Sequence, residues 1–139
     1  MQQVYVVADN IVGPLGGTTR DNFDQVLLGN SGISLQQNAA YAAAPFYGAM
    51  MATGQLDAYT AGYNVNGYTT FEKLVVASVQ NALQQTGVSL TDKRTGFLIS
   101  TTKGNIELLE QQPEGAAAPV ADMRLFSSAN KIEIGRAHV

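Results

Sequence analysis

Few side chains in this sequence could do chemistry. The chain has no cysteine and a single histidine, His138, which lies in the last six residues, IGRAHV. It therefore has no thiol nucleophile, and its one imidazole has no second histidine or cysteine with which to bind a metal. Asp9 and Asp24 lack the spacing of an acid–base pair, and we interpret them as solvated or helix-capping carboxylates. We expect no catalytic residue, metal site or cofactor site within this chain.

Two loops have compositions that occur at ligand sites. The first, GPLGG at 13–17, lacks both the Gly-Lys-Ser/Thr ending of a P-loop and the Gly-x-Gly-x-x-Gly spacing of a dinucleotide site. We interpret it as a tight turn between a strand and a helix. The second, STTKGN at 100–105, follows a predicted buried strand. The carboxyl ends of strands are where α/β folds gather their ligands, so this loop is the better candidate.

The elements that would position these loops follow an α/β order. Apolar and β-branched residues predict buried strands at the start of QVYVVADNIVGPLGG (3–17) and in TGFLIST (95–101). A helix is predicted after Thr18 or Thr19, ending at Gly29. A longer one is predicted after Thr69 or Thr70, ending at Gly87. Beyond it we expect a short helix in NIELLEQQ (105–112), a loop in PEGAAAPVA (113–121) and another helix beginning in DMRLFSSANKI (122–132).

Residues 34–68 are rich in Ala, Gly and Tyr and show no sustained period. We predict an irregular excursion between core elements, with a short helix near Phe46–Met51. Five of the six tyrosines lie between Tyr41 and Tyr68. These rings either pack the excursion onto the rest of the protein or form a stacking surface for a ligand.

Composition excludes several function classes. The eight Lys and Arg residues are scattered and the net charge is −3, whereas nucleic-acid binders carry a clustered basic surface. No apolar run approaches the ~18 residues of a membrane-spanning helix. The N-terminus has no basic and apolar signal-peptide pattern. We expect a cytoplasmic protein with neither nucleic-acid nor membrane partners.

Three stretches resemble the β-ketoacyl-acyl carrier protein synthases, condensing enzymes with the thiolase fold. VYVVADNIVGPLGGTTRDNFDQVLLGNSGI is similar to their opening strand, Ser-Pro-Leu-Gly turn and first helix, although Gly13 stands in place of the usual serine. FEKLVVASVQNALQQTGVSLTDKRTGFLISTTKGN is similar to their Ala- and Leu-rich helix and the strand after it. RLFSSANKI is similar to their Ser-x-x-Ala-Asn-x-Ile segment. The resemblance implies an α/β fold, the incomplete N-terminal part of a thiolase-like layered α-β-α domain over residues 1–133.

The resemblance also implies a decarboxylative Claisen condensation of acyl and malonyl thioesters carried by an acyl carrier protein, in fatty-acid or polyketide-type synthesis. The family uses a cysteine thiolate, two histidines and an oxyanion hole, and no metal or organic cofactor. Those residues would lie beyond Asn130, so the chain itself should be inactive. Family members form homodimers or heterodimers with a related synthase. The competing interpretation is a non-catalytic, chain-length-factor type subunit that dimerises with an active partner.

Two segments could border the substrate region if the resemblance holds. In the family, the exit of the second strand runs close to the acyl pocket, which implies that Thr101, Thr102 and Lys103 border it. The alternative is a plain turn with Lys103 in solvent. The helix of NIELLEQQ would either help cover the pocket of the partner subunit or pack within its own subunit, and its apolar residues are Ile106, Leu108 and Leu109.

The C-terminal hexapeptide does not match the family. Ile134–Val139 can be back-translated as ATC GGA AGA GCA CAC GTC, which matches a common sequencing adapter, and GRAHV fits neither a helix continuation nor a fold terminus. We interpret 134–139 as adapter read-through and exclude His138 from the native protein. A self-sufficient small binding domain is the third interpretation. Because the two predicted strands need neighbours, we expect the chain alone to be aggregation-prone or partly molten.

Overall fold

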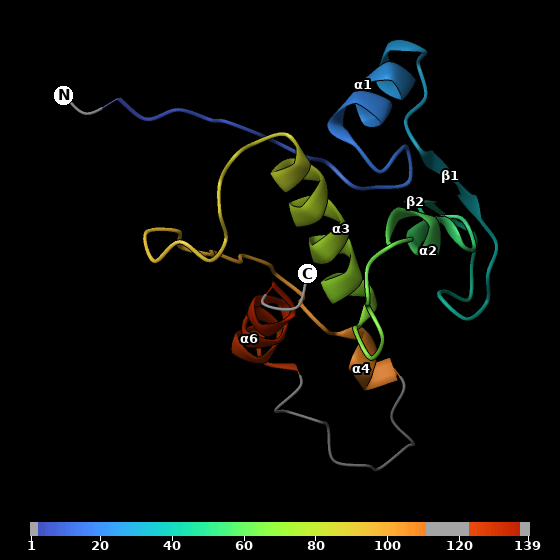
Figure 1. Cartoon of the computed structure of the whole chain (residues 1–139). Coiled ribbons are helices and arrows are strands. Elements are labelled where there is room, and N and C mark those ends of the chain that lie inside the picture. Colours follow the sequence, from blue (N-terminus) through green and yellow to red (C-terminus); the bar gives the residue numbers. More distant parts are fainter. Residues whose placement is uncertain (1–2, 111–122, 137–139) are drawn as a thin grey trace.

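The computed structural model describes residues 3–110 and 123–136 (Figure 1). Within these residues the fold is mixed α/β, with five helices and one two-stranded antiparallel sheet. The elements in chain order are α1 (Thr19–Leu27), β1 (Ile33–Gln36), β2 (Phe46–Ala49), α2 (Gln55–Tyr59), α3 (Thr70–Gln84), α4 (Glu107–Glu110) and α6 (Leu125–Arg136). No helix of the described residues is long and apolar enough to cross a membrane.

Helix α3 lies in the middle of the molecule (Figure 1). Its N-terminal end meets α4 and α6, and its C-terminal end approaches the segment that precedes α1. The described core around it is small and largely polar. The buried apolar side chains are Ala77 and Ile132, and the buried polar ones are Thr60, Glu72, Asn105 and Ser128. Polar contacts therefore contribute an unusual share of the packing around α3.

Helices α1 and α3 begin and end as local chemistry predicts. Thr18 is the N-cap of α1, and its hydroxyl accepts a hydrogen bond from the Asp21 backbone N–H at 3.0 Å. Gly29, with φ of 82°, follows α1 and donates its N–H to the carbonyl of Val26, as in a Schellman cap. Thr69 caps α3, which extends to Gln84, close to the predicted stop. The helices predicted after Thr18 and after Thr69 are confirmed.

The two predicted strands are not formed. Val4 is 94% exposed and Leu98 is 96% exposed, and neither segment belongs to the one sheet of the described residues. The prediction that these segments are buried strands is wrong here, and the reason is non-local. A strand becomes regular only when a second strand satisfies its backbone, and the described residues supply no partner strand to either segment.

The Tyr-rich segment is more ordered than predicted. β1 and β2 form an antiparallel pair in which Ile33 lies opposite Ala49 and Leu35 opposite Tyr47. The prediction of a helix near Phe46–Met51 is wrong, because these residues include β2. The short helix of this segment is α2, a few residues later. Burial alternates along β2, with the side chain of Phe46 more buried than that of Tyr47, which is the period of a strand.

Three of the five tyrosines bind the excursion to the rest of the protein. The Tyr59 ring packs against Gly17, the Tyr63 hydroxyl accepts from Gln84, and the Tyr68 hydroxyl donates to the Lys131 carbonyl at 3.1 Å. Tyr41 and Tyr47 are exposed. The packing interpretation is therefore confirmed for Tyr59, Tyr63 and Tyr68.

The C-terminal helix differs from expectation at its end. α6 begins at Leu125, as RLFSSANKI predicts, and its backbone continues through Gly135 and Arg136. The expectation that GRAHV does not continue a helix is wrong for these two residues. His138 and the predicted loop at 113–121 lie outside the described residues.

Candidate functional site

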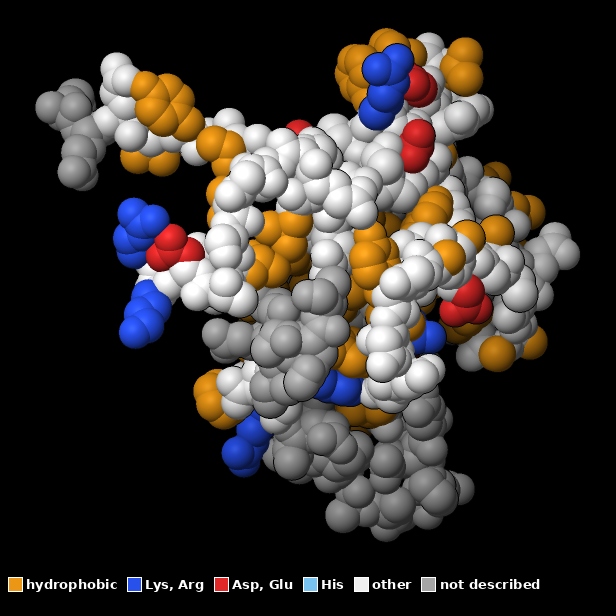
Figure 2. Space-filling model, in the orientation of Figure 1, with side chains coloured by type: hydrophobic (Ala, Val, Ile, Leu, Met, Phe, Trp, Pro, Cys, Tyr) orange, Lys and Arg blue, Asp and Glu red, His pale blue; other side chains and the backbone are white. Residues whose placement is uncertain are grey.

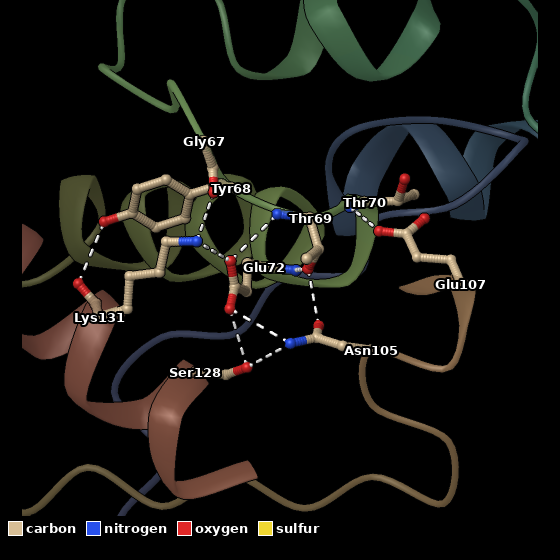
Figure 3. A network of polar contacts seen from close by, with 9 residues as sticks. All are labelled: Gly67, Tyr68, Thr69, Thr70, Glu72, Asn105, Glu107, Ser128 and Lys131. Atoms are coloured by element: carbon tan, nitrogen blue, oxygen red, sulfur yellow. Dashed lines mark hydrogen bonds and ion pairs between the residues drawn. The ribbon is translucent and has the colours of Figure 1, made fainter. Parts of the chain in front are cut away.

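The most connected side chains of the described residues surround the carboxylate of Glu72 (Figure 3). Glu72 occupies the third position of α3, where it forms a capping box with Thr69. One carboxylate oxygen, Oε2, accepts the Thr69 backbone N–H at 3.0 Å, and the Thr69 hydroxyl accepts the Glu72 backbone N–H at 3.2 Å. The Glu72 side chain is only 3% exposed. A buried carboxylate needs such partners, because its charge has left water.

Two neutral side chains from distant segments complete the other side of the carboxylate. Ser128 of α6 donates its hydroxyl to Glu72 Oε1 at 2.9 Å, and the Asn105 side-chain amide donates to the same oxygen at 3.3 Å. The Asn105 amide also donates to Ser128 Oγ at 2.8 Å, and its carbonyl oxygen accepts the Thr69 hydroxyl at 2.7 Å. Asn105 and Ser128 are both fully buried. We call Thr69, Glu72, Asn105, Ser128 and Lys131 the Glu72 network.

Lys131 supplies the positive charge of the network. Its ammonium lies 2.7 Å from Glu72 Oε2, also donates to the carbonyl of Gly67, and lies 4.8 Å from the centre of the Tyr68 ring. Burial of the Glu72 carboxylate raises its pKa. The hydrogen bonds from Lys131, Thr69 and Ser128, together with the Lys131 charge, outweigh burial and hold the pKa below its ordinary value. Glu72 is therefore ionised at neutral pH.

The network ties α3 to the other elements at its N-terminal end. A further bond joins the Thr70 backbone N–H to Glu107 Oε1 of α4 at 2.6 Å. Ser128 is 1% exposed, so neither its hydroxyl nor the carboxylate beside it is open to a substrate. The Lys131 ammonium stands where a cation would have to approach Glu72. The described residues contain no group of three or more His, Cys, Asp or Glu side chains that could hold a metal. We therefore interpret the Glu72 network as a structural contact that holds α4 and α6 against the N-terminal end of α3.

The predicted pocket residues lie on an exposed turn just before the network. Thr101, Thr102 and Lys103 are exposed, and Thr101 Oγ1 accepts the backbone N–H groups of Lys103 at 3.3 Å and Gly104 at 3.0 Å. Their place at the border of a substrate pocket stays a prediction. The loop residue that enters the interior is Asn105, which the sequence interpretation did not single out. Ile106 and Leu109 remain about half exposed, so they are not core residues of the described structure.

The GPLGG loop has a structural explanation. Gly13 and Gly16 exchange backbone hydrogen bonds across the turn. A Cβ at Gly16 would lie 2.4 Å from the Cβ of Asp21, and one at Gly17 would lie 2.8 Å from the ring of Tyr59. Gly16 and Gly17 are needed because α1 and α2 approach the backbone closely at these two positions. The interpretation as a tight turn is confirmed, although the element before the turn is not a strand.

An open groove of about 730 Å³ lies between α1, the C-terminal half of α3 and the segment before α1. Asp9 and Asp24 both line it. Asp9 accepts a hydrogen bond from the Thr19 hydroxyl at 3.0 Å, and Asp24 pairs with Arg20 at 3.6 Å along the exposed side of α1. Each carboxylate therefore has a local partner, as expected for solvated or capping groups. The groove contains no converging set of charges of one sign.

Comparison with protein-family models, curated proteins and solved structures finds no match to this chain. The sequence motifs and the Glu72 network are therefore the observations from which a function is argued.

Proposed function

We propose that this chain is the N-terminal part of a β-ketoacyl-acyl carrier protein synthase, with the layered α-β-α domain of the thiolase-like fold. The complete enzyme would condense acyl and malonyl thioesters with loss of carbon dioxide. The observation that carries the proposal is the Glu72 network (Figure 3). Four of its five side chains come from two of the stretches on which the resemblance rests: Glu72 and Asn105 from the two ends of the second, and Ser128 and Lys131 from RLFSSANKI.

The network joins segments that are far apart in the sequence. Ser128 is 56 residues from Glu72 along the chain and Asn105 is 33 residues from it, yet both bind the same carboxylate oxygen. Glu72 and Asn105 lie in the second of the three similar stretches, and Ser128 and Lys131 lie in the third, so these two stretches share one set of contacts. The opening stretch contributes no member of the network. Asn105 fixes the end of the STTKGN loop. In the proposed enzyme it would act as a positioning residue that holds Thr101, Thr102 and Lys103 at the pocket border.

The exposed apolar segments also support the proposal. The resemblance assigns Val4–Val7 and the TGFLIST segment to buried strands of a sheet. Val4–Val7 is exposed, and Figure 2 shows apolar side chains along this extended N-terminal segment, whereas TGFLIST alternates half-buried with exposed residues. Apolar segments with no neighbouring strand are what the first part of a larger layered sheet would present. The thiol and imidazole groups for the condensation would be supplied by residues beyond this chain. We expect the 139-residue chain alone to be inactive.

The experiment is a condensation assay on the protein encoded by the extended reading frame. The purified protein is incubated with acyl- and malonyl-loaded carrier protein, and the β-ketoacyl product is detected by mass spectrometry. Product from the extended protein, and none from the 139-residue chain, is the expected result. Product only after addition of a related active synthase would support the non-catalytic subunit instead. No product and no dimer under either condition would overturn the proposal.

A further inference from the structure

The segment between α2 and α3 contains a dipeptide whose chemistry neither the network nor the proposed function uses. Asn66 is the one asparagine of the chain that is followed by glycine. Asn66 and Gly67 form the central residues of a turn closed by a hydrogen bond from the Tyr68 N–H to the Val65 carbonyl at 3.1 Å. Gly67 has a φ of 72°, the left-handed region that a type II turn requires at this position.

We propose that Asn66 is a site of spontaneous deamidation, with water as the co-reactant. The Gly67 backbone nitrogen, after loss of its proton, attacks the side-chain carbonyl carbon Cγ of Asn66. The new N–Cγ bond closes a five-membered succinimide, and the Cγ–Nδ2 bond breaks to release ammonia. Water then opens the ring at one of its two carbonyls, which leaves aspartate or isoaspartate at position 66. The net change exchanges an amide for a carboxylic acid and consumes one water.

The local structure leaves both reacting groups accessible. Asn66 and Gly67 are exposed, and in the described part of the chain neither the Asn66 side chain nor the Gly67 N–H has a hydrogen-bond partner. No atom lies within 4 Å of the position that a Cβ of Gly67 would occupy, so the space beside the Gly67 Cα is open. One backbone hydrogen bond closes the turn, and the Lys131 ammonium also binds the Gly67 carbonyl, but neither contact engages the Asn66 side chain or the Gly67 N–H.

The same segment contains a matched internal control. Asn64 is exposed like Asn66, but its side-chain oxygen accepts the Asn66 backbone N–H at 3.4 Å. The residue after Asn64 is Val65, whose branched Cβ hinders approach of the following backbone nitrogen. Asn30, another exposed asparagine, is bound to the Gln25 side chain at 2.8 Å. The structure therefore predicts reaction at Asn66 in preference to Asn64 and Asn30.

Deamidation would alter the surroundings of Lys131. The Gly67 carbonyl accepts a hydrogen bond from the Lys131 ammonium. The product carries a new carboxylate on the preceding residue, and its isoaspartyl form adds one backbone methylene at that point. The reaction thus occurs at the edge of the Glu72 network.

The test is peptide mapping by mass spectrometry of the full chain held at neutral and mildly alkaline pH. We expect conversion at residue 66 that is faster at higher pH, a positive reaction with an isoaspartate methyltransferase, and no conversion at 66 in Asn66→Gln, since glutamine would need a less favourable six-membered ring. A free peptide spanning residues 62–70 is the reference for an unprotected site. Conversion at Asn64 equal to that at Asn66 would overturn the proposal. So would a rate in the chain about tenfold below that of the peptide, which is ~1.4 kcal/mol of protection.

Discussion

Replacement of Glu72 by alanine tests whether the network holds α6 against α3. The substitution removes the acceptor of four hydrogen bonds, which come from Thr69, Asn105, Ser128 and Lys131. It leaves the backbone of α3 in place, because alanine favours a helix. The expected result is a loosened α6.

The size of the effect follows from which donors lose their partners. Removing one member of a buried ion pair costs about 3–5 kcal/mol. The Lys131 side chain is 39% exposed and can turn to water, which puts the cost near the lower end. Asn105 and Ser128 keep their bond to each other at 2.8 Å, which limits the penalty further. Loss of one half of the capping box adds about 1 kcal/mol. We expect a total of about 3 kcal/mol.

Hydrogen exchange followed by mass spectrometry measures this effect locally, without requiring a cooperative melt of the whole chain. In Glu72→Ala, peptides from α6 should exchange about two orders of magnitude faster. Glu72→Gln keeps the side-chain shape and should give a smaller increase. The matched control is Asp57→Ala, which removes the exposed ion pair with Lys73 at the neighbouring position of α3, worth at most about 1 kcal/mol. Unchanged α6 exchange in Glu72→Ala, or an equal change in Asp57→Ala, would refute the role of the network.

Three further predictions concern acid stability, turn packing and self-association. Because the pKa of Glu72 is lower in the folded chain than its ordinary value, its stabilising contribution is present at neutral pH and is lost as the pH falls through the folded pKa. The protection of the α6 amides, taken relative to the intrinsic exchange rate at each pH, should therefore fall in acid, and much less so in Glu72→Gln. Gly17→Ala should lower the free energy of unfolding in urea by about 1–2 kcal/mol, because the new Cβ would lie 2.8 Å from the Tyr59 ring. The control is Gly87→Ala, whose Cβ meets no atom within 4 Å and which should be neutral or slightly stabilising. Val6 is 88% exposed in an uncharged apolar run, and we expect this segment to promote self-association. Val6→Lys should therefore lower light scattering from a concentrated solution of the chain. Unchanged scattering would contradict this role.

Helices α1 and α3 could be predicted from the sequence and the two strands could not, for a physical reason. Thr18 and Thr69 cap their helices through residues three positions away, so the signals for α1 and α3 lie within one turn of sequence. The segments around Val4 and Leu98 have the composition of strands, but a strand needs a partner elsewhere in the chain, and composition does not reveal whether one is present.

The candidate site was visible in the sequence only in part. The Thr-x-x-Glu pattern of Thr69 and Glu72 is a recognisable capping box, and it places a carboxylate at the start of α3. Nothing in the sequence indicates that Asn105 and Ser128 bind the same carboxylate, because that contact depends on how α6 packs against α3. The sequence points to Thr101, Thr102 and Lys103 in the STTKGN loop, whereas the buried member of that loop is Asn105.

The central proposal, that the chain is the first part of a condensing enzyme, is tested most directly by the source DNA beyond the codon for Lys131. We predict that the reading frame departs from IGRAHV and continues to a cysteine among small residues and then to two histidines. An open frame in which that cysteine is replaced would identify the non-catalytic subunit. A stop codon directly after IGRAHV would contradict the account, because the chain would then be a complete protein without the groups on which the condensation depends.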